Sequence, residues 1–225
     1  MLNFIYWPIS AVLWFWHWLL SLVMDPAWGI TWILAIVLLT WTLKALMVKP
    51  TISQIRSSRK MQEIQPKVQE IRAKYGNDQT KAAQEMQKVY KESGVRPMAG
   101  CLPVLVQIPM FIGLFHVLRS FNRTGTTWGQ LGLSAEENAN LSNYAFSVED
   151  VRSFLRADLF GAPLSSFMVQ PKEQLAAFAE FGGIPTVTTI GIVAIPLMIL
   201  ASIATHFNSR ASVARQTPAA AAQPQ

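Results

Sequence analysis

The chain has 225 residues, of which 51% are hydrophobic and 14% are charged, and its formal net charge is +6. This composition excludes a large soluble core and is typical of an integral membrane protein. The positive charge does not require nucleic acid, and no direct DNA binding is expected, because orientation across a membrane and attraction to anionic lipids explain it equally well. A single cysteine, Cys101, excludes an intrachain disulfide and a cysteine metal cluster. We therefore expect an all-α integral membrane protein with no metal and no cofactor.

The first apolar stretch, residues 3–24, has Trp side chains spread along its length, and indole rings prefer the headgroup zone of a bilayer. Asn3, Ser10 and His17 recur at seven-residue spacing, with Ser21 four residues further on, so they form a narrow polar stripe on a helix. The pattern predicts an amphipathic helix lying in the outer interface, with an extra membrane span as the alternative. The stretch lacks the Lys/Arg-bearing start and the A-x-A site of a secretory signal.

Residues 28–48 form the first predicted core span, because about 20 residues at a rise of about 1.5 Å each cross the hydrocarbon. Its one charge is Lys44. Lys44 lies a turn from the cytosolic end, so it can extend its ammonium to the headgroups. The alternative is that it faces a wet cavity, which Thr40, one turn earlier on the same face, favours. Both interpretations remain open from position alone.

Residues 49–97 are predicted to form a cytoplasmic basic helical hairpin. The stretch holds eleven Lys/Arg against five Asp/Glu, and short basic loops stay on the cytoplasmic side of a membrane. Apolar residues recur at three and four positions and predict two antiparallel helices: Ile52, Ile55, Met61, Ile64, Val68, Ile71 and Tyr75, then Ala82, Ala83, Met86, Val89 and Tyr90.

Single residues in this hairpin also predict where its helices begin, end or bend. Gly76 is expected to stop the first helix, and Asn77 or Asp78 to cap the second. Pro66 is expected to kink the first helix or to mark its real start. For most of the basic side chains, an ordinary solvated helix face explains the charge as well as a partner does.

A second span is predicted at residues 101–120, with Pro103 and Pro109 inside it and Gln107 between them. Hydrocarbon leaves an amide unsatisfied at a cost of several kcal/mol, so Gln107 must bond to water or across helices. Prolines at the same depth favour a bent helix that lines a cavity. A Gln that only joins two helices is the alternative.

Three strings in this region resemble one known family, the YidC/Oxa-type membrane protein insertases. They are MQEIQPK at 61–67, QEM at 84–86 with VYK at 89–91, and above all GCLPVLVQIPMF at 100–111. The last string is long and chemically unusual, so it is specific. The similarity is strongest from about Lys44 to Leu118, and an interfacial helix before the first core span is also the family pattern. The family carries a basic residue, usually Arg, in that span; Lys44 stands in its neighbourhood, about one residue further from Pro50.

Residues 121–183 are predicted to form an extracytoplasmic loop with short helices, because their acids outnumber their bases. The string Ser147–Asp150 is expected to open a short amphipathic helix, and Gly161-Ala-Pro163 to end it. Residues 184–207 form the third predicted span, which carries Thr188. Residues 208–225, rich in Ala, Gln and Pro, are expected to be a disordered cytoplasmic tail.

The resemblance implies five core spans, but no apolar run of membrane length follows Phe207. We therefore expect the last two core helices to be absent from this chain. A fragment, a deliberately shortened chain and a variant completed by another polypeptide explain this equally well.

Taken with the resemblance, these residues indicate a non-enzymatic insertase and chaperone of the plasma (inner) membrane, working through a hydrated, positively charged groove. The expected groove residues are Lys44, Gln107, Thr40 and Thr188. The expected partner-binding cations of the cytoplasmic hairpin are Arg59, Lys60, Lys67, Arg72 and Lys74. Expected partners are nascent membrane protein substrates, a ribosome or targeting receptor, the Sec translocon and membrane lipids. A subunit of a transporter or channel is the alternative; an intramembrane enzyme is not expected, because no G-x-S-x-G or H-E-x-x-H string occurs.

Overall fold

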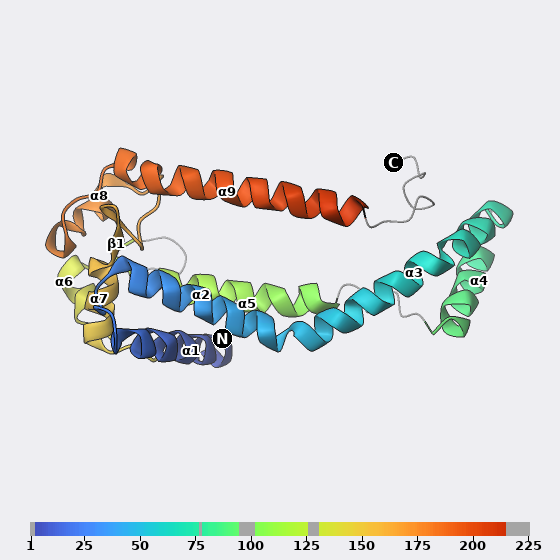
Figure 1. The fold of residues 1–225 in the computed structure, drawn as a ribbon, viewed down its shortest axis with the longest axis horizontal. Coiled ribbons are helices and arrows are strands. Elements are labelled where there is room, and N and C mark those ends of the chain that lie inside the picture. Colours follow the sequence, from blue (N-terminus) through green and yellow to red (C-terminus); the bar gives the residue numbers. More distant parts are fainter. Residues whose placement is uncertain (1–2, 77, 95–101, 126–130, 215–225) are drawn as a thin grey trace. The chain divides into compact units, whose positions relative to one another are not determined.

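A computed structural model describes residues 3–76, 78–94, 102–125 and 131–214 of the chain. The chain is mostly helical (Figure 1). Its elements are α1 (Asn3–Ser21), α2 (Gly29–Leu46), α3 (Val48–Lys74), α4 (Gln79–Glu92), α5 (Leu102–Arg119), α6 (Ala135–Ala139), α7 (Val148–Arg156), β1 (Asp158–Leu159), β2 (Ala162–Pro163), α8 (Lys172–Ala176), the 3-10 helix η2 (Ala179–Phe181) and α9 (Val187–Ala214). They divide into two compact units, Met1–Lys44 with Ile108–Ser202, and Ala45–Gln107 with Ile203–Gln225.

Two of the described helices, α2 and α9, are long and apolar enough to cross a membrane. The predicted span at 101–120 begins at Cys101, which lies outside the described residues, and continues as α5. The helix α9 runs to Ala214, so the expected disorder from residue 208 is wrong for 208–214. Those seven residues contain no Pro or Gly, and nothing in their sequence stops a helix that is already formed. Residues 215–225 lie outside the described part.

The first unit has a core of aromatic rings centred on Trp32, which is fully buried. Phe121, Phe146 and Phe154 surround its indole with ring centroids 4.9–5.6 Å away, in edge-on or tilted orientations. On another side, the imidazole of His17 stacks on the indole at 3.7 Å. The core therefore joins α1, α2 and α5 to the segment that follows α5, which we call the cap and define as residues 121–125 and 131–183.

Hydrogen bonds between distant segments fix the cap on these helices. The indole Nε1 of Trp32 donates to Ser153 Oγ at 3.1 Å, and that hydroxyl donates to the carbonyl of Pro26 at 2.6 Å. The same carbonyl lies 3.1 Å from His17 Nε2. Ser10 Oγ accepts from the backbone N–H of Ala145 at 3.1 Å. Two members of the predicted polar stripe, Ser10 and His17, are thus buried against the cap and the loop after α1, while Asn3 is exposed.

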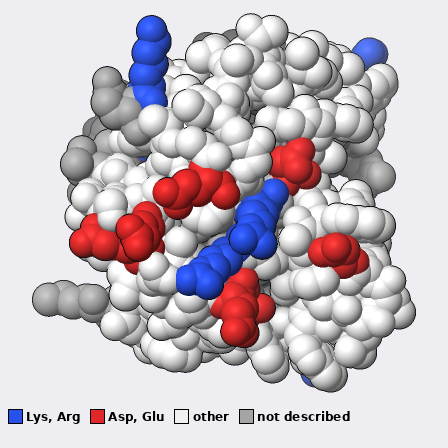
Figure 2. Space-filling model, turned by 90° about the vertical axis from the view of Figure 1, so that its left-hand side faces the viewer, with Lys and Arg blue, Asp and Glu red and all other residues white. Residues whose placement is uncertain are grey.

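Within the cap, local sequence signals specify where a helix begins. Ser147 and Asp150 form a reciprocal capping box at the start of α7, which confirms the expected start of this helix. The expected end is wrong, because α7 stops at Arg156 and Gly161 lies in the turn between β1 and β2. Both turn residues, Phe160 and Gly161, have positive φ (53° and 79°), as a tight hairpin turn requires. Acidic side chains are frequent on the face of the molecule that the cap forms (Figure 2).

In the second unit, α4 lies against the end of α3 (Figure 1). Ile64 and Val68 of α3 and Ala82 of α4 are its buried apolar residues within these two helices. Asp78 caps α4, since its carboxylate accepts from the N–H of Lys81 at 3.0 Å, as expected from the sequence. The helix α3 is continuous from Val48 to Lys74, so Pro66 lies inside it and does not mark its start.

Candidate functional site

The predicted groove residues of α2 follow one another along a single helix. Ile36, Thr40 and Lys44 are spaced by four residues, so they lie along one strip of the helix surface. The hydroxyl of Thr40 donates to the carbonyl of Ile36 at 2.8 Å, which satisfies it within the helix. Lys44 is exposed and lies in the last turn of α2. This placement suits a snorkelling lysine and a cavity-lining one equally, so the role of Lys44 stays a prediction.

The other two predicted groove residues lie on α5 and α9. Gln107 is half-buried in α5 and belongs to the second unit. Thr188 is exposed in the first turn of α9, which packs on the rest of its unit through Ile190 and Gly191. Thr40 and Lys44 are neighbours along one face of α2.

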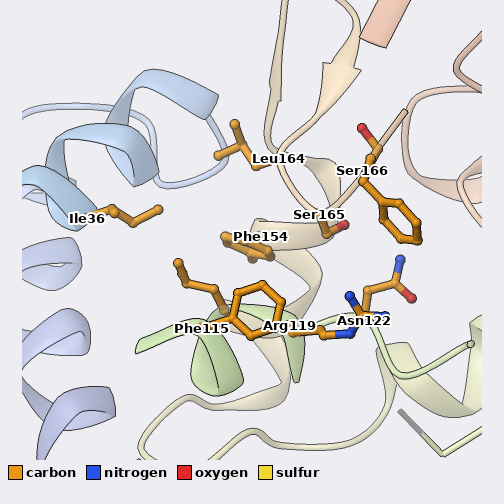
Figure 3. A pocket seen from close by; sticks show the side chains of 10 residues that line it. Ile36, Phe115, Arg119, Asn122, Phe154, Leu164, Ser165 and Ser166 are labelled. Atoms are coloured by element: carbon orange, nitrogen blue, oxygen red, sulfur yellow. The ribbon is translucent and has the colours of Figure 1, made fainter. Parts of the chain in front are cut away.

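A pocket that the sequence did not reveal lies in the first unit, between α2, α5, α7 and the cap segment 164–167 (Figure 3). Its volume is about 310 Å³, and its walls are largely apolar, with Ile36, Phe154 and Leu164 among them. Its one charge is Arg119, the last residue of α5. The guanidinium carbon lies 5.9 Å from the ring centroid of Phe115 and 5.5 Å from that of Phe167. Arg119 is therefore held between two aromatic faces, as in a cation–π contact.

Another cluster joins α1 and α5 to the cap. The ring of Tyr6 stacks on His116 at 4.1 Å, and His116 Nε2 lies 2.9 Å from the hydroxyl of Tyr144. Arg123 donates from Nε to the carbonyl of Ser120 at 2.7 Å. Burial lowers the pKa of the Arg123 guanidinium and raises the pKa of the Tyr144 phenol. These contacts place the cluster among the supports of the cap.

The predicted partner-binding cations are all exposed on α3: Arg59, Lys60, Lys67, Arg72 and Lys74. Lys60, Lys67 and Lys74 repeat every seven residues and so form a line along the helix, beside the apolar seam that faces α4. The ammonium of Lys74 lies 5.4 Å from the ring centroid of Tyr75. The line presents three positive charges to solvent without disturbing the contact between the helices.

The sequence profile of the 60Kd inner membrane protein family matches residues 23–225. The chain belongs to this family. It is 50% identical over 224 residues to the membrane protein insertase YidC of Mycobacterium tuberculosis, covering 100% of this chain and 60% of that protein. It is 49% identical over 224 residues to the protein of the same name from Mycolicibacterium paratuberculosis, covering 100% of this chain and 62% of that protein.

A more distant relative with the same name, from Corynebacterium efficiens, is 32% identical over 221 residues, covering 96% of this chain and 52% of that protein. The chain thus spans about three-fifths of the length of the first two relatives. No solved structure matches it. The family and the two apolar helices fit an inner membrane protein.

Two features of this member of the 60Kd inner membrane protein family were not predicted from the sequence. The seven-residue spacing of Ser10 and His17 gave a stripe but not its inward direction. Arg119 ends an apolar run and has the appearance of an ordinary basic flank, yet it lies four residues after Phe115 and eight after Phe111. That spacing was the available signal for a cation beside aromatic rings on one helix face. Among the residues that the structure describes, no group of three or more His, Cys, Asp or Glu could hold a metal ion.

Proposed function

We propose that this chain inserts membrane proteins into the lipid bilayer and assists their folding, through a hydrated, positively charged groove. The observation that carries the proposal is the 50% identity, over the whole chain, to a protein named membrane protein insertase YidC. A single cation near one end of an apolar helix, Lys44 in α2, supports the groove. Gln107, Thr40 and Thr188 are its further proposed lining residues.

The mechanism follows from solvation. A polar tail that crosses hydrocarbon loses its hydration, and water held inside the bilayer beside a fixed cation reduces that penalty. An acidic tail also gains Coulomb attraction, which is stronger in a medium of low dielectric constant than in water. The client's own apolar span then leaves the groove for lipid. Removal of its apolar surface from water drives this step, so no chemical reaction is needed.

The proposed topology places residues 49–97 and the C-terminal end in the cytoplasm and residues 121–183 outside. Eleven basic side chains between 49 and 97 support it through their bias toward the cytoplasmic side. The helix at residues 3–24 then lies in the outer interface, with a membrane span as the alternative. In this arrangement α3 and α4 would receive a nascent chain, a ribosome or a targeting receptor, and the protein would work alone or beside the Sec translocon.

Reconstitution of this chain into liposomes tests the function directly. We expect protease-protected insertion of a single-span client with a short acidic tail to exceed that in empty liposomes. Lys44→Glu should abolish this insertion, measured as a decrease of at least about tenfold, because the acidic tail then meets a like charge. Lys49→Glu, a charge reversal at an exposed position of α3 five residues away, is the matched control and should keep it.

Unchanged insertion by Lys44→Glu would remove Lys44 from the mechanism. No insertion by the chain, restored when the two expected further spans are supplied, would show that the groove needs them. Flux of a solute through the liposomes without any client insertion would favour the transporter or channel alternative.

The basic line of α3 makes a separate prediction about partners. Replacing Lys60, Lys67 and Lys74 together by Gln should weaken binding to isolated ribosomes or anionic vesicles and reduce its dependence on salt, since fewer charges are screened. Gln substitution at Lys81, Lys88 and Lys91 of α4 removes the same charge and is the control. Equal weakening in both variants would indicate attraction to net charge rather than to this line.

A further inference from the structure

We propose that the pocket at Arg119 binds an acidic side chain of the client segment during its transfer across the membrane. This proposal rests on the proposed function and adds a second binding site for the client's charge, beyond Lys44. The pocket lies wholly within the first unit. Its position, its polar groups and its size each favour this ligand.

The cation of the pocket is held in place. The guanidinium of Arg119 lies over the rings of Phe115 and Phe167, which come from α5 and from the cap. Aromatic faces stabilise a cation without neutralising it. An Arg also offers donors in a planar fork that matches a carboxylate. The pocket therefore presents a positioned charge that a flexible surface arginine would not.

A hydroxyl in the wall of the same pocket lacks a hydrogen bond. The buried Oγ of Ser165, a lining residue, has no partner among the residues that the structure describes, whereas the Oγ of Ser166 donates to the carbonyl of Pro163 at 2.6 Å. Figure 3 shows Ser165, Asn122 and Arg119 around one side of the pocket, with Ile36 and Leu164 on the other. Buried polar atoms are normally satisfied, so an unsatisfied hydroxyl in a pocket points to a polar ligand. Rotation of the Ser165 side chain about its Cα–Cβ bond would let this hydroxyl and the guanidinium of Arg119 donate to one carboxylate.

The volume and the walls favour a single side chain. A pocket of about 310 Å³ is at the small end of ligand sites. Apart from its polar side it is lined by apolar groups, with Ile36 and Phe154 among them, which suit the methylene stem of Glu or Asp. The pocket thus matches a carboxylate on a short aliphatic stem.

The position of the pocket connects it with the proposed path of the client. Ile36, a lining residue, begins the strip of α2 that continues through Thr40 to Lys44, about 12 Å away at the rise of a helix. On α5, Phe111 and Phe115 precede Arg119 at four-residue intervals, and both are exposed, at 65% and 46%. An acidic side chain that leaves Lys44 along α2 therefore meets Arg119 as the next cation of the first unit's helices. This continuity favours a moving client over a resident lipid.

The experiment compares two clients that differ only in their tail, one carrying Glu and the other Gln, with the chain in liposomes. Arg119→Gln should reduce insertion of the Glu-tailed client by about threefold to tenfold and leave the Gln-tailed client unchanged. Arg119→Lys should restore part of the difference, because it keeps the charge but loses the planar fork. Ser165→Ala should reduce the same client by a smaller factor. Arg156→Gln removes an exposed charge at the end of α7 and should change neither client.

A second measurement tests contact. A photo-crosslinking residue at Leu164 should capture the Glu tail more than the Gln tail, and Arg119→Gln should abolish this preference. An unchanged Glu/Gln ratio in Arg119→Gln, with the original chain active, would overturn the proposal and leave the insertase function standing. Equal loss of both clients would also overturn it, by assigning Arg119 a structural role.

The remaining outcomes separate the ligand and the underlying function. A loss of both clients in Arg119→Gln that occurs in anionic liposomes and not in zwitterionic ones would assign the pocket to an anionic lipid headgroup and overturn the client proposal. Failure of the original chain to insert either client would instead count against the proposed function on which this inference rests.

Discussion

The cap and its helices differ from α3 and α4 in how they are held together. Around Trp32, rings from several elements pack on every side, and buried polar groups bond between segments as distant as Ser10 and Ala145. Between α3 and α4, burial is confined to a narrow seam at Ile64, Val68 and Ala82. A region with dense burial and long-range bonds opens only at high free-energy cost, whereas one held by a single seam opens locally.

The difference suits different tasks. Lys44 and the Arg119 pocket lie in the first unit, where the cap and the Trp32 core fix the helices that carry them. Positioned charges require such a frame, because a shift of the support moves the charge. The exposed line of Lys60, Lys67 and Lys74 needs no such precision, since binding to a large anionic partner depends on charge more than on exact geometry.

The largest effect should come from emptying the centre of the aromatic core. Trp32→Ala removes a fully buried indole and its bond to Ser153, and should lower the free energy of unfolding of the first unit by about 3–5 kcal/mol. Thermal unfolding in detergent, followed by near-UV circular dichroism, measures it. Trp41→Ala, on the same helix but 68% exposed, is the matched control. Similar losses in the two variants would show that the core is not the main support of the cap.

The second effect comes from a close approach between backbones. A Cβ at Gly29, the first residue of α2, would lie 1.9 Å from the carbonyl oxygen of Asp158 in β1, so Gly29→Ala must displace the hairpin. Displacement of this kind costs about 1–3 kcal/mol. In the other unit, a Cβ at Gly76 would approach the carbonyl oxygen of Arg72 only to 3.4 Å. Gly76→Ala should therefore stay within about 0.5 kcal/mol of the original chain. A reversed order in melting temperature would contradict the close approach.

The sequence predicted best what depends on near neighbours. The N-cap of α4 at Asp78 and the start of α7 at Ser147 each depend on contacts over three residues, and both predictions are confirmed. The predicted end of α7 is wrong, although Gly161 is a residue that commonly breaks helices. Whether such a glycine ends a helix or turns a hairpin depends on the partner strand, here β1 with β2.

Long-range features could not be predicted in the same way. The bond from Trp32 to Ser153 spans 121 residues, and the Arg119 pocket combines α2 and α5 with α7 and residues 164–167 of the cap. The periodicity within one segment does not predict which other segment packs on it. The sequence likewise located Lys44 and its charge, but the surroundings of that charge depend on helices elsewhere in the chain.

The smallest effect concerns a single helix end in the second unit. The N–H of Lys81, which donates to the Asp78 carboxylate, lowers the pKa of Asp78 below its ordinary value of 3.8, and the ammonium of Lys81 adds to the shift. Because the pKa of Asp78 is lower in the folded state than in the unfolded state, this N-cap stabilises α4 fully above pH 3.8. The contribution is lost as the pH falls through the folded pKa.

Hydrogen exchange of the first turn of α4, corrected for intrinsic rates, should therefore show protection at pH 7 that decreases at pH 3. Asp78→Asn keeps a side-chain acceptor that does not titrate, so its protection should change less between these two pH values. Asp78→Ala should lack the protection at both. An equal decrease in the original chain and in Asp78→Asn would assign the acid effect to other carboxylates. The seam at Ile64 and Val68 holds α3 to α4 further along both helices, so exchange there should respond much less in every variant.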